Sequence, residues 1–239
     1  MNNNKPKDWG QDHFSEFADR ARAHEYETIA ALPEQYRLIV RVDSLFKQVQ
    51  ENLAFTKEWF AAMFFLRTHS TFLCAANAAL SGQLPESYML LRGSLENALY
   101  GIYLSHNKKH AKTWLERNES PQAKKKVRDQ FKNATLITFL GTLDRGLARA
   151  ADTLYERCID FGAHPNQLGL TTAMRIEEGD PHPLLKMAYL SGEPASVQLC
   201  LKTTHQVGVF ALAAFRYVFK ERFDILGITE EIEKLKANI

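Results

Sequence analysis

The sequence lacks the short motifs that mark several common enzyme classes. No GxGxxG, no P-loop and no GxSxG occurs in its 239 residues, which argues against dinucleotide binding, Walker-type phosphate binding and α/β-hydrolase chemistry. Its three cysteines form no CxxC pair and lie in apolar stretches, which favours a reducing compartment and a packing role for each thiol. No Glu-x-x-His motif of the di-iron bundles lies on an expected helix. We therefore expect no metal and no cofactor.

A long uncharged apolar run is also lacking. Lys57, Glu58 and Arg67 interrupt the apolar stretch 55–80, and the stretch 207–218 has only 12 residues, whereas a membrane span needs about 20. The first 17 residues contain no apolar segment typical of a signal peptide. We expect a soluble protein of the cytoplasm that has no membrane partner.

Net charge is nearly absent, at +2 from 30 basic and 28 acidic residues. This balance argues against a histone-like polycation, although it leaves room for a local basic patch. With 45% hydrophobic and 24% charged residues, the composition is that of an ordinary globular protein.

Apolar residues recur at spacings of three and four along most of the chain, which predicts helices. We predict one helix from Pro33, one over 56–80, one over 86–104, one over 136–158, one over 196–219 and a short one over 229–237 with Thr229 as its N-cap. The helix over 56–80 is apolar on nearly all sides, which is typical of a central helix. Residues 1–30 are polar, and we expect them to form a tail with about one helical turn.

The stretch 161–195 interrupts this pattern. It contains four of the eight prolines and four of the twelve glycines, and apolar residues alternate on both sides of Glu-Gly-Asp-Pro-His-Pro. Alternation around such a turn predicts a β-hairpin. The sequence therefore predicts an all-α fold: a single helical bundle of five or more helices over 31–239, with a small β-hairpin insertion near 170–190.

One pair of charges lies beside the apolar stripe of the expected helix over 86–104. Arg92 and Glu96 are four residues apart, and Tyr100 continues the same side. An exposed pair of this kind contributes only about 0.2–0.5 kcal/mol, so we expect a partly buried role. The pair is either a structural ion pair that orients a loop or part of a ligand site.

A second candidate follows the helix over 136–158, in the loop that contains His164, Pro165 and Asn166. Loops on a rigid bundle often carry functional sites, and an imidazole with a pKa near 6.5 can act as a general acid or base. Alternatively, His164 hydrogen-bonds a carbonyl at the helix C-terminus.

Arg157 stands seven residues before His164, which gives the pattern Arg-x6-His. An arginine near a helix end, followed by about four to six residues and a histidine, resembles the signature of the HEPN superfamily of helical-bundle proteins. Many members are metal-independent ribonucleases of toxin, phage-defence and RNA-processing systems. The resemblance implies that Arg157 holds the scissile phosphate and that His164 is the acid or base, in a site completed across a homodimer axis. The chain departs from the family at Cys158, where a polar residue is usual.

A second likeness concerns the segment Leu-Arg-Gly-Ser-Leu-Glu-Asn at 91–97 together with the later Gly-Ala-His-Pro. These segments are similar to those of bacterial all-helical families of unknown function. That likeness implies a polar site in which Arg92, Glu96 and His164 meet, with Asn166 nearby, and implies no particular chemistry.

The third candidate is the basic stretch 107–132, with nine Lys or Arg against three acidic residues. Its densest part contains Lys124, Lys125, Lys126 and Arg128, which suits contacts to the phosphates of RNA. Its ordinary interpretation is a solvated helical face. His106 and His110, four residues apart in this region, are expected to be solvated rather than metal ligands.

Three hypotheses follow. The first is a HEPN-like metal-independent ribonuclease that uses Arg157 and His164, with RNA on the basic stretch. The second is a non-catalytic binding module whose small ligand contacts Arg92, Glu96, Tyr100, His164 and Asn166. The third is a helical scaffold, as a monomer or homodimer, in which the Arg-Glu-His cluster is structural.

Overall fold

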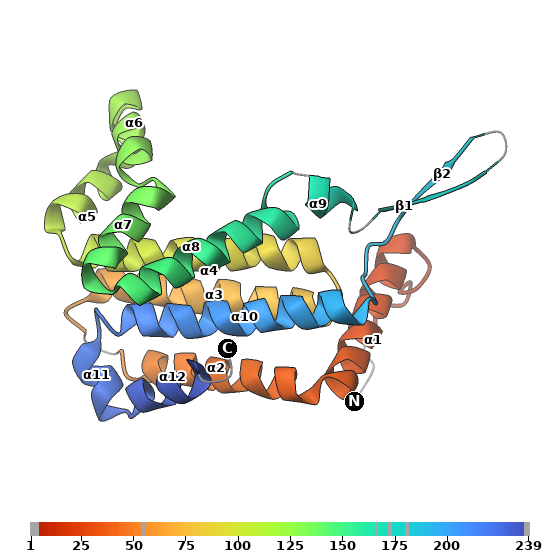
Figure 1. The fold of residues 1–239 in the computed structure, drawn as a ribbon, viewed down its shortest axis with the longest axis horizontal. Coiled ribbons are helices and arrows are strands. Elements are labelled where there is room, and N and C mark those ends of the chain that lie inside the picture. Colours follow the sequence, from red (N-terminus) through yellow and green to blue (C-terminus); the bar gives the residue numbers. More distant parts are fainter. Residues whose placement is uncertain (1–4, 54–55, 166, 172–173, 180–181, 237–239) are drawn as a thin grey trace.

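The fold is an α-helical bundle with one small two-stranded antiparallel sheet, as seen in a computed structural model (Figure 1). The structure describes residues 5–53, 56–165, 167–171, 174–179 and 182–236. This architecture confirms the predicted all-α bundle with a hairpin insertion. None of the helices in these residues combines the length and the apolar character needed to cross a membrane.

Four long helices form the body of the bundle: α2 (Pro33–Glu51), α3 (Trp59–Leu80), α4 (Leu84–Ser105) and α10 (Pro194–Phe215). Helix α10 packs on the other three, and every residue from Val207 to Phe215 is buried. Two glycines permit this packing. A Cβ at Gly208 would lie 2.5 Å from Val42, and a Cβ at Gly101 would lie 2.8 Å from Phe215.

Two shorter helices cover one side of this body. They are α7 (Asn133–Leu143) and α8 (Arg145–Cys158), where the sequence predicted one continuous helix over 136–158. Asp144 breaks the helix because its backbone is extended and its side chain accepts a hydrogen bond from the N–H of Leu147. A residue that caps a new helix in this way cannot continue the preceding one. The apolar stripe is unaffected, since both helices bury it in the same core.

The predicted N-terminal tail is wrong for most of its length. Residues His13–Ala31 form helix α1, which Asp12 caps by accepting from the N–H of Ser15 at 2.9 Å. The helix buries few side chains, among them Ala21 and Thr28. Its sequence therefore has no strong apolar period.

The predicted hairpin is confirmed as β1 (Met174–Glu177) and β2 (Leu184–Met187), with Met174 opposite Met187. Residues Gln167–Thr171, where the alternation begins, form a short helix, α9, and Thr172 lies outside the described residues.

The remaining short helices lie at one end of the bundle or close the chain (Figure 1). Helices α5 (Lys108–Leu115), η1 (Glu116–Asn118) and α6 (Pro121–Gln130) carry the basic stretch. Helices α11 (Lys220–Ile225) and α12 (Ile228–Lys236) end the chain. Thr229 lies within α12 and donates its hydroxyl to Asp224, so its predicted role as an N-cap is wrong.

Candidate functional site

Arg92 and Glu96 form the predicted ion pair on α4, and a tyrosine from α8 completes it. The Nε of Arg92 lies 2.9 Å from Oε1 of Glu96, and the hydroxyl of Tyr155 donates to the same oxygen at 3.0 Å. The guanidinium also lies over the Tyr155 ring, 5.1 Å from its centre. Burial, and then the negative charge of Glu96, raise the pKa of Tyr155, so that its hydroxyl remains a donor.

The same arginine holds the loop that carries His164. Its Nη1 donates to the carbonyl of Ala163 at 3.3 Å, the last residue of the π-helical segment η2 (Ile159–Ala163). Within η2, Gly162 has a φ of 151°, and a Cβ there would lie 2.6 Å from Cα of Pro85. Arg92 and Gly162 thus hold the start of this loop close to α4.

His164 follows this segment and is exposed. Its Nδ1 lies 3.2 Å from the carbonyl oxygen of Pro165, which follows it in the chain. The hydrogen bond from Arg92 to the carbonyl of Ala163 thus reaches the residue immediately before His164. Asn166, predicted beside them, lies outside the described residues.

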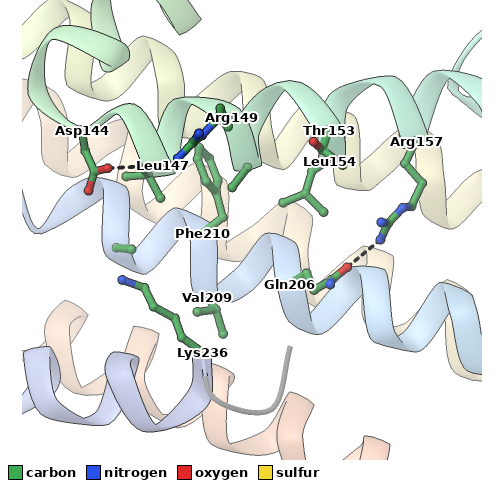
Figure 2. Close-up of a pocket in the computed structure, with 13 residues that line it drawn as sticks. Asp144, Leu147, Arg149, Thr153, Leu154, Arg157, Gln206, Val209, Phe210 and Lys236 are labelled. Atoms are coloured by element: carbon green, nitrogen blue, oxygen red, sulfur yellow. Dashed lines mark hydrogen bonds between the residues drawn. The ribbon is translucent and has the colours of Figure 1, made fainter.

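Arg157 is directed elsewhere. Its Nη1 donates to Oε1 of Gln206 at 2.6 Å and to Oγ1 of Thr203 at 3.3 Å, both on α10. Figure 2 shows the guanidinium reaching from α8 toward Gln206 across a groove. The side chain of Arg157 thus bridges two helices, whereas His164 follows the end of η2.

The groove between α8, α10 and α12 has a volume of about 520 Å³. Its lining includes an apolar floor of Leu147, Leu154, Val209, Phe210 and Ala213. Its charged lining residues are Asp144, Arg149, Arg157 and Lys236, three cations and one anion (Figure 2).

The four charged residues that line the groove differ in their partners. Arg149 has no hydrogen-bond or ion-pair partner among the residues that the structure describes, and Arg157 contacts only neutral groups there. Lys236 pairs with Glu233 at 2.8 Å. The oxygens of Asp144 accept from the N–H of Leu147 and the hydroxyl of Tyr217, and the first of these bonds chiefly lowers the pKa of Asp144. An anion in the groove would therefore meet two arginines that no carboxylate of the described residues neutralises.

Tyr100 does not face this groove. Its hydroxyl donates to the carbonyl of Phe131 at 3.3 Å, and its ring stacks on Phe131 and on Phe64. These contacts tie α4 to the C-cap of α6, which accounts for Tyr100 without a ligand.

The basic residues of α6 form a separate surface. Lys124, Lys125, Lys126 and Arg128 are exposed, and none has an ion-pair partner within the described part of the chain. Helix α6 lies at one end of the bundle, and η2 lies at the far end of α8 (Figure 1). The 14 residues of α8 alone span about 21 Å at 1.5 Å per residue, so the basic surface and His164 are well separated.

No group of three or more His, Cys, Asp or Glu residues suited to a metal ion occurs in the described ranges. His106 bonds the carbonyl of Ile102 at 2.9 Å, and the His110 ring stacks on Tyr103. Burial raises the pKa of Cys158 to about 12 and that of Cys200 to about 11, as expected for packed thiols. Cys74 is exposed, so the expectation that it packs in the core is wrong.

Sequence reasoning missed the groove because its residues come from three separate helices. One signal was present: Arg149, Thr153 and Arg157 are four residues apart and share a face of α8. Gln206 and Lys236 carried no comparable signal.

The chain matches no protein-family model, no curated protein and no solved structure with which it was compared.

Proposed function

We propose that this protein is a binding module for a small anionic amphipath: a carboxylate or phosphate headgroup on an apolar body. The observation that carries this proposal is the α8–α10–α12 groove, in which an apolar floor lies beside Arg149 and Arg157. Small-molecule sites are commonly clefts of about 300–1,000 Å³ with apolar walls and a few placed polar groups. At about 520 Å³ the groove is within this range.

The two arginines give the site its preference for an anion. A guanidinium can bind a carboxylate or phosphate through two parallel hydrogen bonds. Arg157 is held in place by Gln206 and Thr203, which orient it without neutralising its charge. Arg149, which is free of such contacts in the described chain, can turn toward the headgroup while the apolar body covers Leu154 and Phe210.

The proposal is tested with dodecanoate and with dodecanol, which has the same chain without the charge. We expect dodecanoate to raise the melting temperature and to bind at least 10-fold more tightly than dodecanol by calorimetry. The double variant Arg149→Gln/Arg157→Gln should lose that preference. Arg145→Gln, an exposed arginine of α8 outside the groove, is the matched control and should retain it.

Equal affinity for the two probes would contradict the proposal. So would unchanged binding of dodecanoate to the double variant. Circular dichroism of both variants confirms that any loss of binding is not a loss of folding.

A second candidate function is metal-independent RNA cleavage by a HEPN-like pair, Arg157 and His164. It is favoured by the four cations of α6 that no carboxylate neutralises in the described structure, because such a surface suits a phosphate backbone. It requires cleavage that a chelator does not inhibit and that His164→Ala abolishes while the helical spectrum is unchanged. Since His164 is not a lining residue of the groove, the same variant should bind dodecanoate normally, which separates the two functions.

A further inference from the structure

Helix α3 carries an apolar stripe that faces solvent. The residues Trp59, Met63, Leu66, Ser70, Leu73 and Asn77 follow one another at alternating spacings of four and three, and all are exposed. The four large apolar members have exposed fractions of 43–61%. The sequence predicted a central helix here, and that prediction is wrong for this one face.

Charge is nearly absent from the same face. All of α3 is described, and of its exposed side chains only Arg67 is charged. A helix that faces water normally presents charged residues on that side. An exposed apolar stripe without charges is typical of an interaction surface.

Helix α4 packs along α3 without widening this stripe. Ser87 donates to the carbonyl of Ala75 and Ser94 to that of Thr68, which sets α4 antiparallel to α3 and turns these two serines toward it. Met89 lies two residues, or about 200°, beyond Ser87 around the helix, so it is on the side of α4 that faces away from α3. The exposed stripe therefore belongs to α3.

We propose that this face of α3, defined by Trp59, Met63, Leu66, Ser70, Leu73 and Asn77, is the interface with a second copy of the chain. Alternating spacings of four and three are the pattern by which two helices interdigitate at a small crossing angle. A twofold axis near Ser70 sets Leu66 of one copy against Leu73 of the other. The small side chain of Ser70 lets the two helices approach closely.

The size of the face is that of a weak, reversible dimer. A helix of 22 residues is about 33 Å long and about 10 Å wide. The projected area is therefore about 330 Å² per copy, below the roughly 800 Å² per partner of a standard interface and in the range of transient associations.

A second copy fits the face better than a lipid surface does. Helices that lie on membranes flank their apolar stripe with many Lys and Arg residues, and here Arg67 is the sole cation among the exposed residues of α3. An uncharged stripe also meets its own copy without repulsion between like charges.

The test is the mass of the protein in solution, measured by light scattering after size exclusion. We expect a dimer at about 100 µM for the full chain and for Val40→Glu, a control on α2 that is 41% exposed and lies outside the face. Leu66→Glu and Leu73→Glu should be monomers with unchanged helical spectra, since neither side chain is buried.

Cys74 provides a second measurement, because it is the exposed cysteine and lies next to Leu73. Its reaction with a maleimide should slow at least 10-fold on dimerisation and return to the fast rate in Leu73→Glu. A monomer at 100 µM, a dimer that survives both glutamates, or a monomer that binds uncharged lipid vesicles through this face would overturn the proposal.

Discussion

We expect the stability of this protein to depend on pH through His205. The residue lies in the middle of α10 and is only 2% exposed, and its Nε2 is buried without a hydrogen-bond partner within the described structure. Burial disfavours the charged imidazolium and lowers the pKa of His205 from 6.5 to about 4. The folded protein therefore holds this imidazole neutral at a pH where the unfolded chain protonates it.

This difference sets the sign and the size of the effect. Between pH 6.5 and pH 4 the unfolded state binds one more proton than the folded state, so acidification destabilises the fold across this window. At about 1.36 kcal/mol per pKa unit, the full effect below pH 4 is about 3 kcal/mol. About 2 kcal/mol of it is lost between pH 8 and pH 5, which lowers the melting temperature of a chain of this size by roughly 4–8 °C.

The assay is urea denaturation at pH 8 and pH 5, with His205→Leu as the comparison. The variant should lose about 2 kcal/mol less stability than the parent protein over this interval, because leucine does not titrate and all other groups are shared. Equal losses would refute the reasoning and would mean that water or a rearranged neighbour solvates His205 in the folded state.

Four further predictions concern the free energy of unfolding and can be measured by urea denaturation. Gly101→Ala should lower the free energy of unfolding by about 1–3 kcal/mol, because the new Cβ would lie 2.8 Å from a Phe215 carbon. Gly141→Ala, whose nearest contact is an ordinary 3.6 Å, should instead stabilise α7 by up to about 1 kcal/mol. Asp144→Ala should lower the free energy of unfolding by about 1–3 kcal/mol, because it removes the helix cap and the hydrogen bond from the hydroxyl of Tyr217. Asp144→Asn keeps the cap and should lower it by less. Arg92→Ala should lower the free energy of unfolding by about 1–2 kcal/mol. This is less than the loss of one partner of a fully buried ion pair, because the side chains of Arg92 and Glu96 are 30% and 40% exposed. The same variant should also speed proteolysis of the loop after α8, since it removes the hydrogen bond to Ala163. Proteolysis that is unchanged in Arg92→Ala would contradict the role of Arg92 in fixing that loop.

The long helices could be predicted because each buries a stripe that repeats along its own sequence. Helices α2, α4 and α10 begin close to the predicted residues, each with proline in the first turn. Helix α1 was not predicted, since a helix that rests on the bundle through a few small side chains needs no apolar period. The break at Asp144 was also missed, because a capping aspartate differs from a surface aspartate in its backbone angles and its side-chain hydrogen bond, and neither is visible in the sequence.

For the candidate site, the sequence indicated individual residues, and the fold determined their partners. Arg92 and Glu96 were found because an i, i+4 charge pair beside an apolar stripe is visible in one segment. In the fold, Tyr155 donates to Glu96 and Arg92 donates to the carbonyl of Ala163, two partners that lie far along the chain. Arg157 was found by its spacing from His164, and the fold directed it to α10 instead.

The sequence by itself determined the helical class and the hairpin insertion, because these depend on the periodicity of neighbouring residues and on where proline and glycine interrupt it. Only the tertiary structure decided which faces of those helices are covered. Helix α3 is apolar on nearly all sides in sequence, yet its partners cover it incompletely and leave Trp59, Met63, Leu66 and Leu73 to solvent. The groove beside Arg149 and Arg157 likewise exists because α8, α10 and α12 converge there. Convergence of distant segments depends on the packing of the whole core, which no local pattern of residues records.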